Sequence, residues 1–288
     1  MSDEKVTAYF GNTLQIIPGV HNALSAVIAE SAGFHSLFVT GAGVSNNFLG
    51  EPDLGFLTFD QLKCHVEQIR MKVGLPIFVD MDAGFGDAKC VNRYGRQLHA
   101  LGVAGIFLED QVQPKRCGHF SGKQIVLAEE MQEKVRALRE VSPELIIVAR
   151  TDALASEGLD ASLRRATAYR DAGADATFVE APVSKEQMHQ IALLPWPQII
   201  NMVEGGKTPL VSRAELREMG FAVALYANFA SRMAMQAMKV AYRSLFLQGD
   251  TSVLLDEMIS FEERQTILGL SEWQDSEQRW IDKKLIKS

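Results

Sequence analysis

Two aspartates and a glutamate stand at the ends of two successive apolar runs. Asp80 and Asp82 occur in the stretch VDMDAGFGD, and Glu109 ends the next run in FLEDQ. Side chains two positions apart on a strand point to the same side, so both aspartates can face one site. Carboxylate oxygens are the ligands that Mg²⁺ or Mn²⁺ prefers. We therefore predict a divalent metal site at Asp80, Asp82 and Glu109; loop-capping aspartates that pair with a basic neighbour are the structural alternative.

A cysteine lies among basic residues in the segment PKRCGHFSGK, residues 114–123. Lys115, Arg116 and His119 surround Cys117, and positive neighbours lower the pKa of a thiol. A cysteine in such a place can act as a nucleophile or as a general acid or base. We predict a catalytic group of Cys117, Lys115 and His119, against the alternative of a basic surface loop with an incidental cysteine. Zinc is disfavoured because no second Cys/His pair stands at ligand spacing.

Further polar residues end other apolar runs. Arg150, in VARTDA, is suited to clamp a carboxylate with two hydrogen bonds, or else to pair with Asp152 or Glu180. Asn201 is followed by a glycine-containing loop that offers donors, and the stretch GAGVSNN, residues 41–47, offers backbone N–H groups for an anion. That last stretch lacks a full phosphate-binding or dinucleotide pattern, so alone it is weak evidence.

The elements that must position these residues form an alternating pattern. Short, continuously apolar runs, typical of strands buried on both faces, alternate with longer helix-period segments such as 59–73 and 159–172. This predicts a parallel sheet, and eight runs favour a (β/α)₈ barrel over an open doubly wound sheet. Five of the eight runs end on, or one residue before, a reactive group, and a barrel gathers all strand ends round one mouth. The runs are Gln15–Pro18, Leu37–Thr40, Pro76–Asp80, Gly105–Glu109, Ile146–Thr151, Ala176–Glu180, Gln198–Asn201 and Val223–Tyr226.

The pattern after about residue 248 is helical only. We predict a single barrel domain over residues 1–288, in which residues from about 250 to 288 form helices that pack outside the barrel or on a partner subunit. These helices carry large apolar residues that a free helix would expose to water: Met258, Ile259, Phe261, Ile267, Leu268, Trp273 and Trp280.

Composition excludes several classes of protein. The 288 residues are 47% hydrophobic and 23% charged, which excludes a disordered chain. The net charge of −7 argues against a nucleic-acid binder. Three cysteines are too few for a disulfide framework. Cys64 and Cys90 fall in helical stretches and are expected to pack in the protein core. We see neither a signal peptide nor a membrane-length apolar stretch, and expect a cytoplasmic protein without membrane or nucleic-acid partners.

The chain resembles the isocitrate lyase/phosphoenolpyruvate mutase superfamily over nearly its whole length. The Lys-Arg-Cys-Gly-His segment is specific to the lyase branch. Other stretches look closer to the 2,3-dimethylmalate lyase and petal death protein group than to 2-methylisocitrate lyases. The resemblance is carried by PGVHNALSA (18–26), LGEPDLGFLT (49–58), VDMDAGFG (79–86), FLEDQVQPKRCGH (107–119), VARTDA (148–153), AGADATFVEAP (172–182) and NMVEGGKTPL (201–210).

The resemblance implies a (β/α)₈ barrel, Mg²⁺ with Mn²⁺ as a substitute, and a homotetramer of dimers that exchange C-terminal helices. It implies cleavage of a C–C bond in a small carboxylate, a 2-alkylmalate, 2,3-dimethylmalate or 2-methylisocitrate, to pyruvate or glyoxylate and a second carboxylate through an enediolate. Matching residue by residue, it assigns the metal to Asp80, Asp82 and Glu109 and proton transfer to Cys117 on a mobile loop. It assigns substrate binding to Thr40, Gly41, Ala42, Asp53, Arg150, Glu180 and Asn201, with Asp53 reaching the metal through water. It also gives Arg150 a catalytic role, in which Arg150 and the backbone N–H groups of Gly41 and Ala42 stabilise developing charge.

The sequence also departs from this pattern. Thr40-Gly41-Ala42 and Tyr226-Ala227 differ from the 2-methylisocitrate lyases where the substrate extends beyond its α-keto-acid part. The identity of the substrate therefore stays open. An oxaloacetate decarboxylase or C–C hydrolase is the first alternative. A phosphonate P–C bond enzyme is disfavoured by the cysteine loop, and a non-catalytic scaffold is disfavoured because every expected reactive position is filled.

Overall fold

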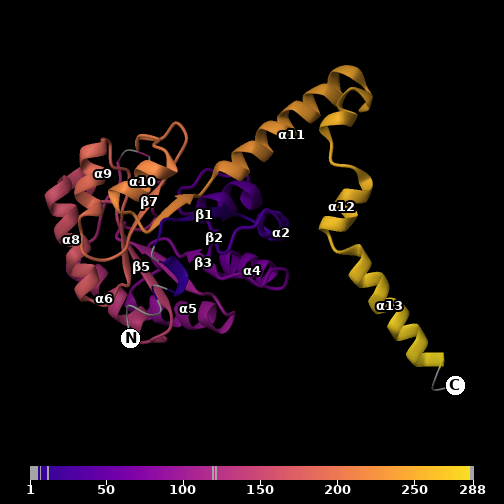
Figure 1. Ribbon diagram of the computed structural model, residues 1–288. Coiled ribbons are helices and arrows are strands. Elements are labelled where there is room, and N and C mark those ends of the chain that lie inside the picture. The colour runs from indigo at the N-terminus through magenta and orange to yellow at the C-terminus, as the bar shows by residue number, and fades with distance from the viewer. Residues whose placement is uncertain (1–5, 7, 12, 119, 121, 286–288) are drawn as a thin grey trace. The chain divides into compact units, whose positions relative to one another are not determined.

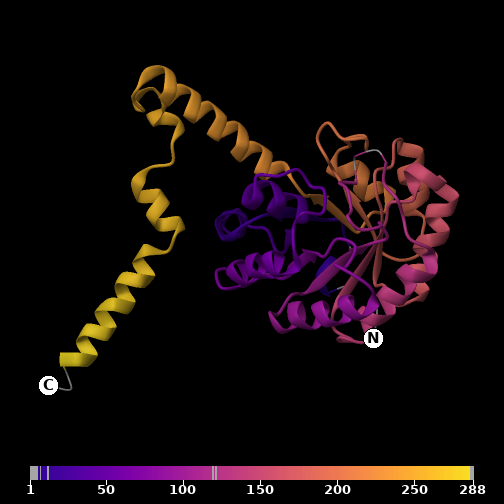
Figure 2. The same ribbon diagram turned by 180° about the vertical axis from the view of Figure 1, so that it is seen from behind.

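The computed structural model of the chain describes residues 6, 8–11, 13–118, 120 and 122–285. Within these residues, parallel strands close into a barrel in chain order, and β8 pairs with β1 from Gln15↔Val223 to Pro18↔Tyr226. Figures 1 and 2 show the barrel from opposite sides, with helices around the strands. The strands are β1 (Gln15–Val20), β2 (Leu37–Val39), β3 (Ile77–Asp80), β4 (Gly105–Glu109), β5 (Ile146–Thr151), β6 (Ala176–Val179), β7 (Gln198–Asn201) and β8 (Val223–Tyr226). The eight predicted runs agree with these strands to within two residues at each end, which confirms the barrel.

Helices follow the strands and cover their outer faces. Helix α4 begins where the Thr58 side chain accepts the N–H of Gln61, and it buries Leu62, Val66 and Ile69 against the core, as its spacing predicts. The helices of the barrel are α2 (Ala23–Ser31), α3 (Gly41–Val44), the π-helix η1 (Ser45–Leu49), α4 (Phe59–Arg70), α5 (Ala88–Ala100), α6 (Ala128–Arg139), α7 (Leu154–Glu157), α8 (Leu159–Asp171), α9 (Lys185–Ala192) and α10 (Arg213–Met219).

One sequence-based expectation about these helices is wrong. Cys64 is exposed on α4, and Cys90 on α5 is only partly buried. Position 64 lies two residues from Leu62, about 200° round the helix, so it faces away from the buried stripe.

The interior of the barrel is filled by alternate residues of its strands. Phe38, Phe78, Phe107, Val148 and Phe178 belong to one buried cluster with Ile199 and Leu225. Phe10, upstream of β1, stacks on Phe78 with ring centroids 5.5 Å apart. Since successive side chains alternate between the two faces of a strand, the residue two positions after each interior residue also points inward, at the carboxyl end of its strand.

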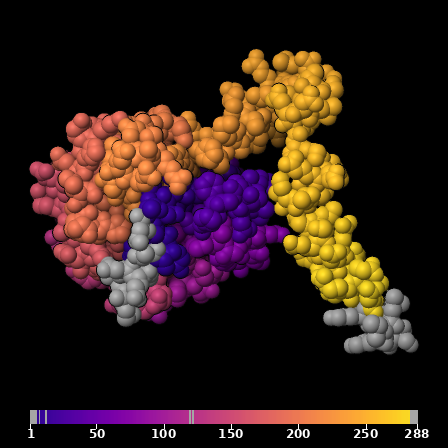
Figure 3. All heavy atoms as spheres, in the orientation of Figure 1, coloured from indigo at the N-terminus to yellow at the C-terminus, as the bar shows by residue number. Residues whose placement is uncertain are grey.

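The chain divides into two compact units, residues 1–231 and 232–288. The second unit comprises most of α11 (Phe229–Gln248), the 3₁₀ helix η2 (Ser252–Glu257), α12 (Phe261–Ile267) and α13 (Leu270–Leu285). In Figure 3 the residues of this unit are coloured from orange to yellow. Phe261, Trp273 and Trp280 each expose more than half of their surface. None of the helices described is long and apolar enough to cross a membrane.

Candidate active site at the mouth of the barrel

The alternation of strand residues explains why polar side chains meet at one end of the barrel. Asp80 follows Phe78 by two positions, and Glu109, Arg150, Glu180 and Asn201 follow interior residues in the same way. All stand at carboxyl ends of parallel strands, which lie side by side round the mouth. The structure thus brings together the strand-end residues that the sequence singled out.

The first part of the site is built on β3. The Asp80 carboxylate accepts the backbone N–H of Gly41 (3.2 Å) through Oδ2 and that of Asp82 (3.2 Å) through Oδ1. Asp82 adopts a φ of +47°, an uncommon conformation for a residue with a side chain. A Cβ at Gly41 would lie 3.0 Å from Asp82 Oδ1 and 3.2 Å from Asp80 Oδ2. The absence of a side chain at Gly41 therefore keeps the two carboxylates accessible.

Lys115 joins this part to the loop that carries the predicted cysteine. Its Nζ lies 2.5 Å from Asp53 Oδ1 and 2.8 Å from Asp82 Oδ1, and its side chain is buried. Burial would lower the pKa of Lys115, but the surrounding carboxylates, Asp82 first, outweigh burial and raise it well above its usual value. Lys115 is therefore an ammonium ion. Burial raises the pKa of Asp82 to about 7 even beside Lys115.

The second part of the site is centred on Arg150, at the end of β5. Its Nε and Nη2 donate to the two carboxylate oxygens of Asp152 at 2.8 and 3.0 Å. Its Nη1 lies 3.3 Å from Glu109 Oε2 and 3.5 Å from Glu180 Oε2. The guanidinium also lies over the Phe178 ring, 5.4 Å from the centroid. Both bridges proposed as structural alternatives for Arg150 exist, and they hold the guanidinium between three carboxylates.

The pKa values of two acids round Arg150 are shifted in opposite directions. Burial raises the pKa of Glu109 well above its usual value, and Arg150 only partly offsets this. Burial acts on Asp152 in the same direction, but Arg150 and Lys123 outweigh it and lower the pKa of Asp152 to about 2. Asp152 is thus the anion that pairs with Arg150. For Glu109, the nearby positive charge does not fully compensate the effect of burial on its pKa.

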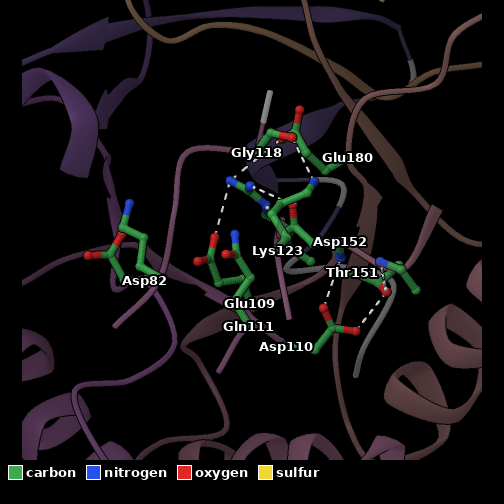
Figure 4. A network of polar contacts seen from close by, with 12 residues as sticks. Asp82, Glu109, Asp110, Gln111, Gly118, Lys123, Thr151, Asp152 and Glu180 are labelled. Atoms are coloured by element: carbon green, nitrogen blue, oxygen red, sulfur yellow. Dashed lines mark hydrogen bonds and ion pairs between the residues drawn. The ribbon is translucent and has the colours of Figure 1, made fainter. Parts of the chain in front are cut away.

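Asp110 anchors this part from below, a role that sequence reasoning did not assign. Its fully buried carboxylate accepts the Thr151 hydroxyl (2.7 Å) and the Asp152 N–H (2.8 Å) (Figure 4). It also accepts the Tyr169 hydroxyl (2.7 Å). These bonds fix the chain between Arg150 and Asp152. The sequence shows Asp110 next to Glu109 at a strand end, which could have marked it as a site residue. Its hydrogen-bond partners, however, lie on β5 and α8, far away in the sequence.

The loop with the Lys-Arg-Cys-Gly segment is attached to the mouth at several points. Gln111 pairs with Ile125 across its base, and the Gln111 side chain holds Arg116 through its N–H (3.0 Å) and carbonyl (2.8 Å). The N–H of Cys117 donates to the Asp53 carbonyl at 3.1 Å. Cys117 is partly buried. His119, which sequence reasoning placed in the catalytic group, lies outside the described residues.

Gly118 brings this loop into direct contact with the Arg150 part of the site. A Cβ at Gly118 would fall 2.3 Å from Arg150 Nη2 and 2.6 Å from Glu180 Cγ. Only a glycine can approach these two side chains so closely. The residue after Cys117 therefore lies on the predicted substrate-binding groups.

Three uncharged polar groups lie at or just beyond the ends of β7, β8 and β1. Among the described residues, Asn201 Oδ1, Asn228 Oδ1 and His21 Nδ1 are buried polar atoms with no hydrogen-bond partner. Burial lowers the pKa of His21, so the imidazole is neutral. Sequence reasoning assigned nothing to His21 and left Asn228 without a role. Both residues lie within two positions of a strand's carboxyl end, and this placement could have identified them as site residues.

Two predicted substrate-binding groups have other partners. Thr40 caps α3 by accepting the N–H of Gly43, and the Gly41 N–H donates to Asp80. In this structure the Gly41 N–H is engaged by Asp80, and its role towards a substrate stays a prediction. Gly41 orients Asp80. Ala42 lies in the first turn of the same short helix.

The donor set suits a hard cation. Asp80, Asp82 and Glu109 supply carboxylate oxygens, and Glu109 Oε1 is a buried oxygen without a hydrogen-bond partner among the described residues. In this structure Lys115 and Arg150 provide the positive charge next to Asp82 and Glu109. Across the described part of the chain, no three acidic, histidine or cysteine side chains are arranged as a ready ligand set. The residues fit Mg²⁺ by their chemistry, because the ion pairs with Lys115 and Arg150 engage only Asp82 Oδ1 and Glu109 Oε2.

Comparison with known proteins gives consistent matches. Residues 11–246 match the family model of phosphoenolpyruvate phosphomutase. The chain is 38% identical to 2,3-dimethylmalate lyase of Eubacterium barkeri over 268 residues, which cover 92% of this chain and 93% of the relative. It is 41% identical to petal death protein of Dianthus caryophyllus over 269 residues, with 92% and 85% covered.

Solved structures agree with these relatives. A crystal structure of 2,3-dimethylmalate lyase, described as a PEP mutase/isocitrate lyase superfamily member, superimposes with a TM-score of 0.90 at 34% identity and covers 97% of this chain and 95% of its own. Oxaloacetate acetylhydrolase in complex with 3,3-difluorooxalacetate gives 0.89 at 33% identity, with 96% and 95% covered. Phosphonopyruvate hydrolase, in complex with oxalate and Mg²⁺, shares the fold with a TM-score of 0.86 at 24% identity, with 98% and 99% covered.

Proposed function

This chain is a member of the phosphoenolpyruvate mutase/isocitrate lyase superfamily, and on that premise we propose that it is a carbon–carbon lyase. The substrate is a 2-hydroxy dicarboxylate or tricarboxylate of the 2-alkylmalate, 2,3-dimethylmalate or 2-methylisocitrate type. The products are an α-keto acid, pyruvate or glyoxylate, and a second carboxylate. The similarity to 2,3-dimethylmalate lyase over 92% of the chain supports this substrate class.

One observation carries the proposal. Gly118 lies against Arg150 and Glu180, so the neighbouring Cys117 is next to the groups that would bind the substrate's carboxylate. A lyase needs an acid at this place, because C–C cleavage leaves a carbanion equivalent that must take up a proton.

The chain's own groups suggest a division of labour. Arg150, prevented from turning by Asp152, binds the carboxylate of the α-keto-acid half. The C–C bond breaks as the substrate's alkoxide becomes a carbonyl, its electron pair passes to the enediolate of the other half, and Cys117 donates a proton to that carbon. The substrate hydroxyl gives up its proton to one of the carboxylates at the mouth. Lys115 cannot accept that proton, because the neighbouring carboxylates hold it as an ammonium ion. A bound Mg²⁺, held by Asp80, Asp82 and Glu109, would supply Lewis-acid polarisation of the hydroxyl and carboxylate.

An oxaloacetate-cleaving hydrolase is the second candidate. The similarity to oxaloacetate acetylhydrolase supports it, with a TM-score of 0.89 at 33% identity. The uncharged groups His21, Asn201 and Asn228 are compatible with either substrate. A decarboxylase would use the same groups without the acid Cys117.

We also propose that the protein acts in the cytoplasm as a homotetramer, a dimer of dimers that exchange C-terminal helices. The large apolar side chains exposed on α12 and α13 support an assembly, because a partner would remove them from water.

A substrate screen tests the proposed function. Purified protein with Mg²⁺ is incubated with 2-alkylmalates, 2,3-dimethylmalate, 2-methylisocitrate and oxaloacetate, and the α-keto acid, oxalate and CO₂ are measured. We expect pyruvate or glyoxylate from a 2-hydroxy acid. Oxalate and acetate from oxaloacetate alone would select the hydrolase, CO₂ would select the decarboxylase, and absence of any turnover would contradict the proposal.

A further inference from the structure

We propose that Lys123 is a positioning residue that holds the Cys117 loop on the mouth of the barrel by joining it to Asp152. Only the expected effect on turnover rests on the proposed function. The contact itself is a property of the loop and of β5.

Lys123 makes two short contacts from an almost fully buried side chain. Its Nζ donates to the Gly118 carbonyl at 2.6 Å and to Asp152 Oδ1 at 2.6 Å, and the Lys123 side chain is 4% exposed (Figure 4). One contact lies within the loop and the other lies on the barrel. Burying an ammonium ion is costly unless it is paired and hydrogen-bonded, so this arrangement is maintained only while the loop lies on the strand ends.

Asp152 is shared between the loop and the substrate-binding arginine. Its Oδ1 accepts from Lys123 and also from Arg150 Nη2 at 3.0 Å, while its Oδ2 accepts from Arg150 Nε. The backbone of Asp152 is fixed in turn by its N–H bond to Asp110. Lys123 therefore attaches the loop to the same rigid anion that orients Arg150, so that loop and arginine keep one geometry.

Gly118 shows what this attachment accomplishes. The glycine already touches Arg150 and Glu180, and its carbonyl is the group that Lys123 holds. Gly118 is joined to Cys117 by a planar peptide bond, so holding Gly118 in place also restricts the position of the Cys117 backbone. Lys115 attaches the loop on the other side of Cys117, to Asp53 and Asp82. The two lysines thus bracket the cysteine, and Lys123 is the one that does not contact predicted metal-site residues.

The test compares Lys123→Met, Lys123→Arg and the control Lys89→Met. Methionine keeps the apolar length without the charge, and arginine restores charge and donors. Lys89 is an exposed lysine whose side chain is 95% exposed. The first readout is the rate at which iodoacetamide alkylates Cys117 in the ligand-free protein, followed by mass spectrometry of the Cys117 peptide. The second is kcat and KM on the best substrate of the screen.

We expect faster alkylation of Cys117 in Lys123→Met than in the unmodified protein, and an unchanged rate in Lys89→Met. In Lys123→Arg the alkylation rate should lie between those of Lys123→Met and the unmodified protein. We expect kcat to fall roughly 10²-fold with little change in KM, because the misplaced acid affects the proton transfer. Unchanged alkylation in Lys123→Met, or a fall in kcat without increased alkylation, would overturn the inference. If Lys123→Met does not fold, the same alkylation comparison with Lys123→Gln decides. Altered alkylation in a protein that turns over no substrate in the screen would keep this inference and reject the proposed function.

Discussion

Arg150 and Asp152, two residues apart at the end of β5, form a two-bond ion pair in which Nε donates to Oδ2 at 2.8 Å and Nη2 donates to Oδ1 at 3.0 Å. This pair leaves only Nη1 directed at Glu109 and Glu180. An arginine that is fixed before the substrate arrives loses little side-chain freedom on binding. The orientation of Arg150 is thus set by the fold.

The Asp152 pair predicts a pH-dependent contribution to stability. The pKa of Asp152 is lowered from 3.8 to about 2, so its stabilising effect is complete above pH 3.8 and is lost as the pH falls through about 2. The difference in the free energy of unfolding between the unmodified protein and Asp152→Asn should narrow by about 1 kcal/mol between pH 6 and pH 3. Urea unfolding at both pH values measures this, and a difference that stays constant would contradict the assignment.

Gly41→Ala should weaken metal binding without unfolding the barrel. The added Cβ would meet Asp82 Oδ1 at 3.0 Å and Asp80 Oδ2 at 3.2 Å, so both carboxylates must shift by a few tenths of an ångström. We expect lower Mg²⁺ affinity by calorimetry. Gly74→Ala, where an added Cβ meets nothing within 4 Å, is the matched control. Equal affinity in both variants would show that Asp80 and Asp82 do not bind the ion.

Chelation should abolish turnover. Asp80, Asp82 and Glu109 supply the carboxylate oxygens that Mg²⁺ and Mn²⁺ prefer. EDTA should remove the activity found in the substrate screen, and either ion should restore it. Full activity in protein that has been dialysed against chelator and contains no metal by elemental analysis would reject the metal site.

Cys117→Ser should remove lyase turnover while leaving the binding of oxalate, a planar mimic of an α-keto-acid enolate, little changed. Serine has nearly the same size, but its hydroxyl is a far weaker acid than a thiol, so proton delivery fails. Loss of general acid catalysis costs roughly 10²–10⁴-fold in kcat. Cys64→Ser, at an exposed position, is the control. Near-normal lyase turnover in Cys117→Ser would show that Cys117 is not the general acid. Intact decarboxylation together with absent lyase activity would favour the decarboxylase.

Deletion of the residues after Gly249 should change the assembly. The removed segment carries Phe261, Trp273 and Trp280, which are largely exposed on a single chain. If a second subunit covers them, the truncated protein should be insoluble or dissociated when examined by size-exclusion chromatography with light scattering. A stable, active, monomeric truncation would contradict the proposed helix exchange.

The barrel and most of its reactive strand ends could be predicted from the amino-acid pattern. Continuous apolar runs are a local property of strands buried on both faces, and the two-residue alternation places Asp80, Glu109 and Arg150 inward once each strand is located. Neither inference needs knowledge of which side chains meet.

The tertiary structure alone decided the pairing. Asp110 could be read as a neighbour of Glu109, but its partners Thr151 and Tyr169 lie on β5 and α8. Lys123 and Asp152 are 29 positions apart and meet only because the loop folds back onto the mouth. Gly41 and Asp80 are 39 positions apart, and the N–H of Gly41 reaches the Asp80 carboxylate only because β2 and β3 are neighbours. Local patterns fix which way a strand residue points, whereas the partner of a buried charge depends on the register of neighbouring strands and on the path of a loop, which no local pattern encodes.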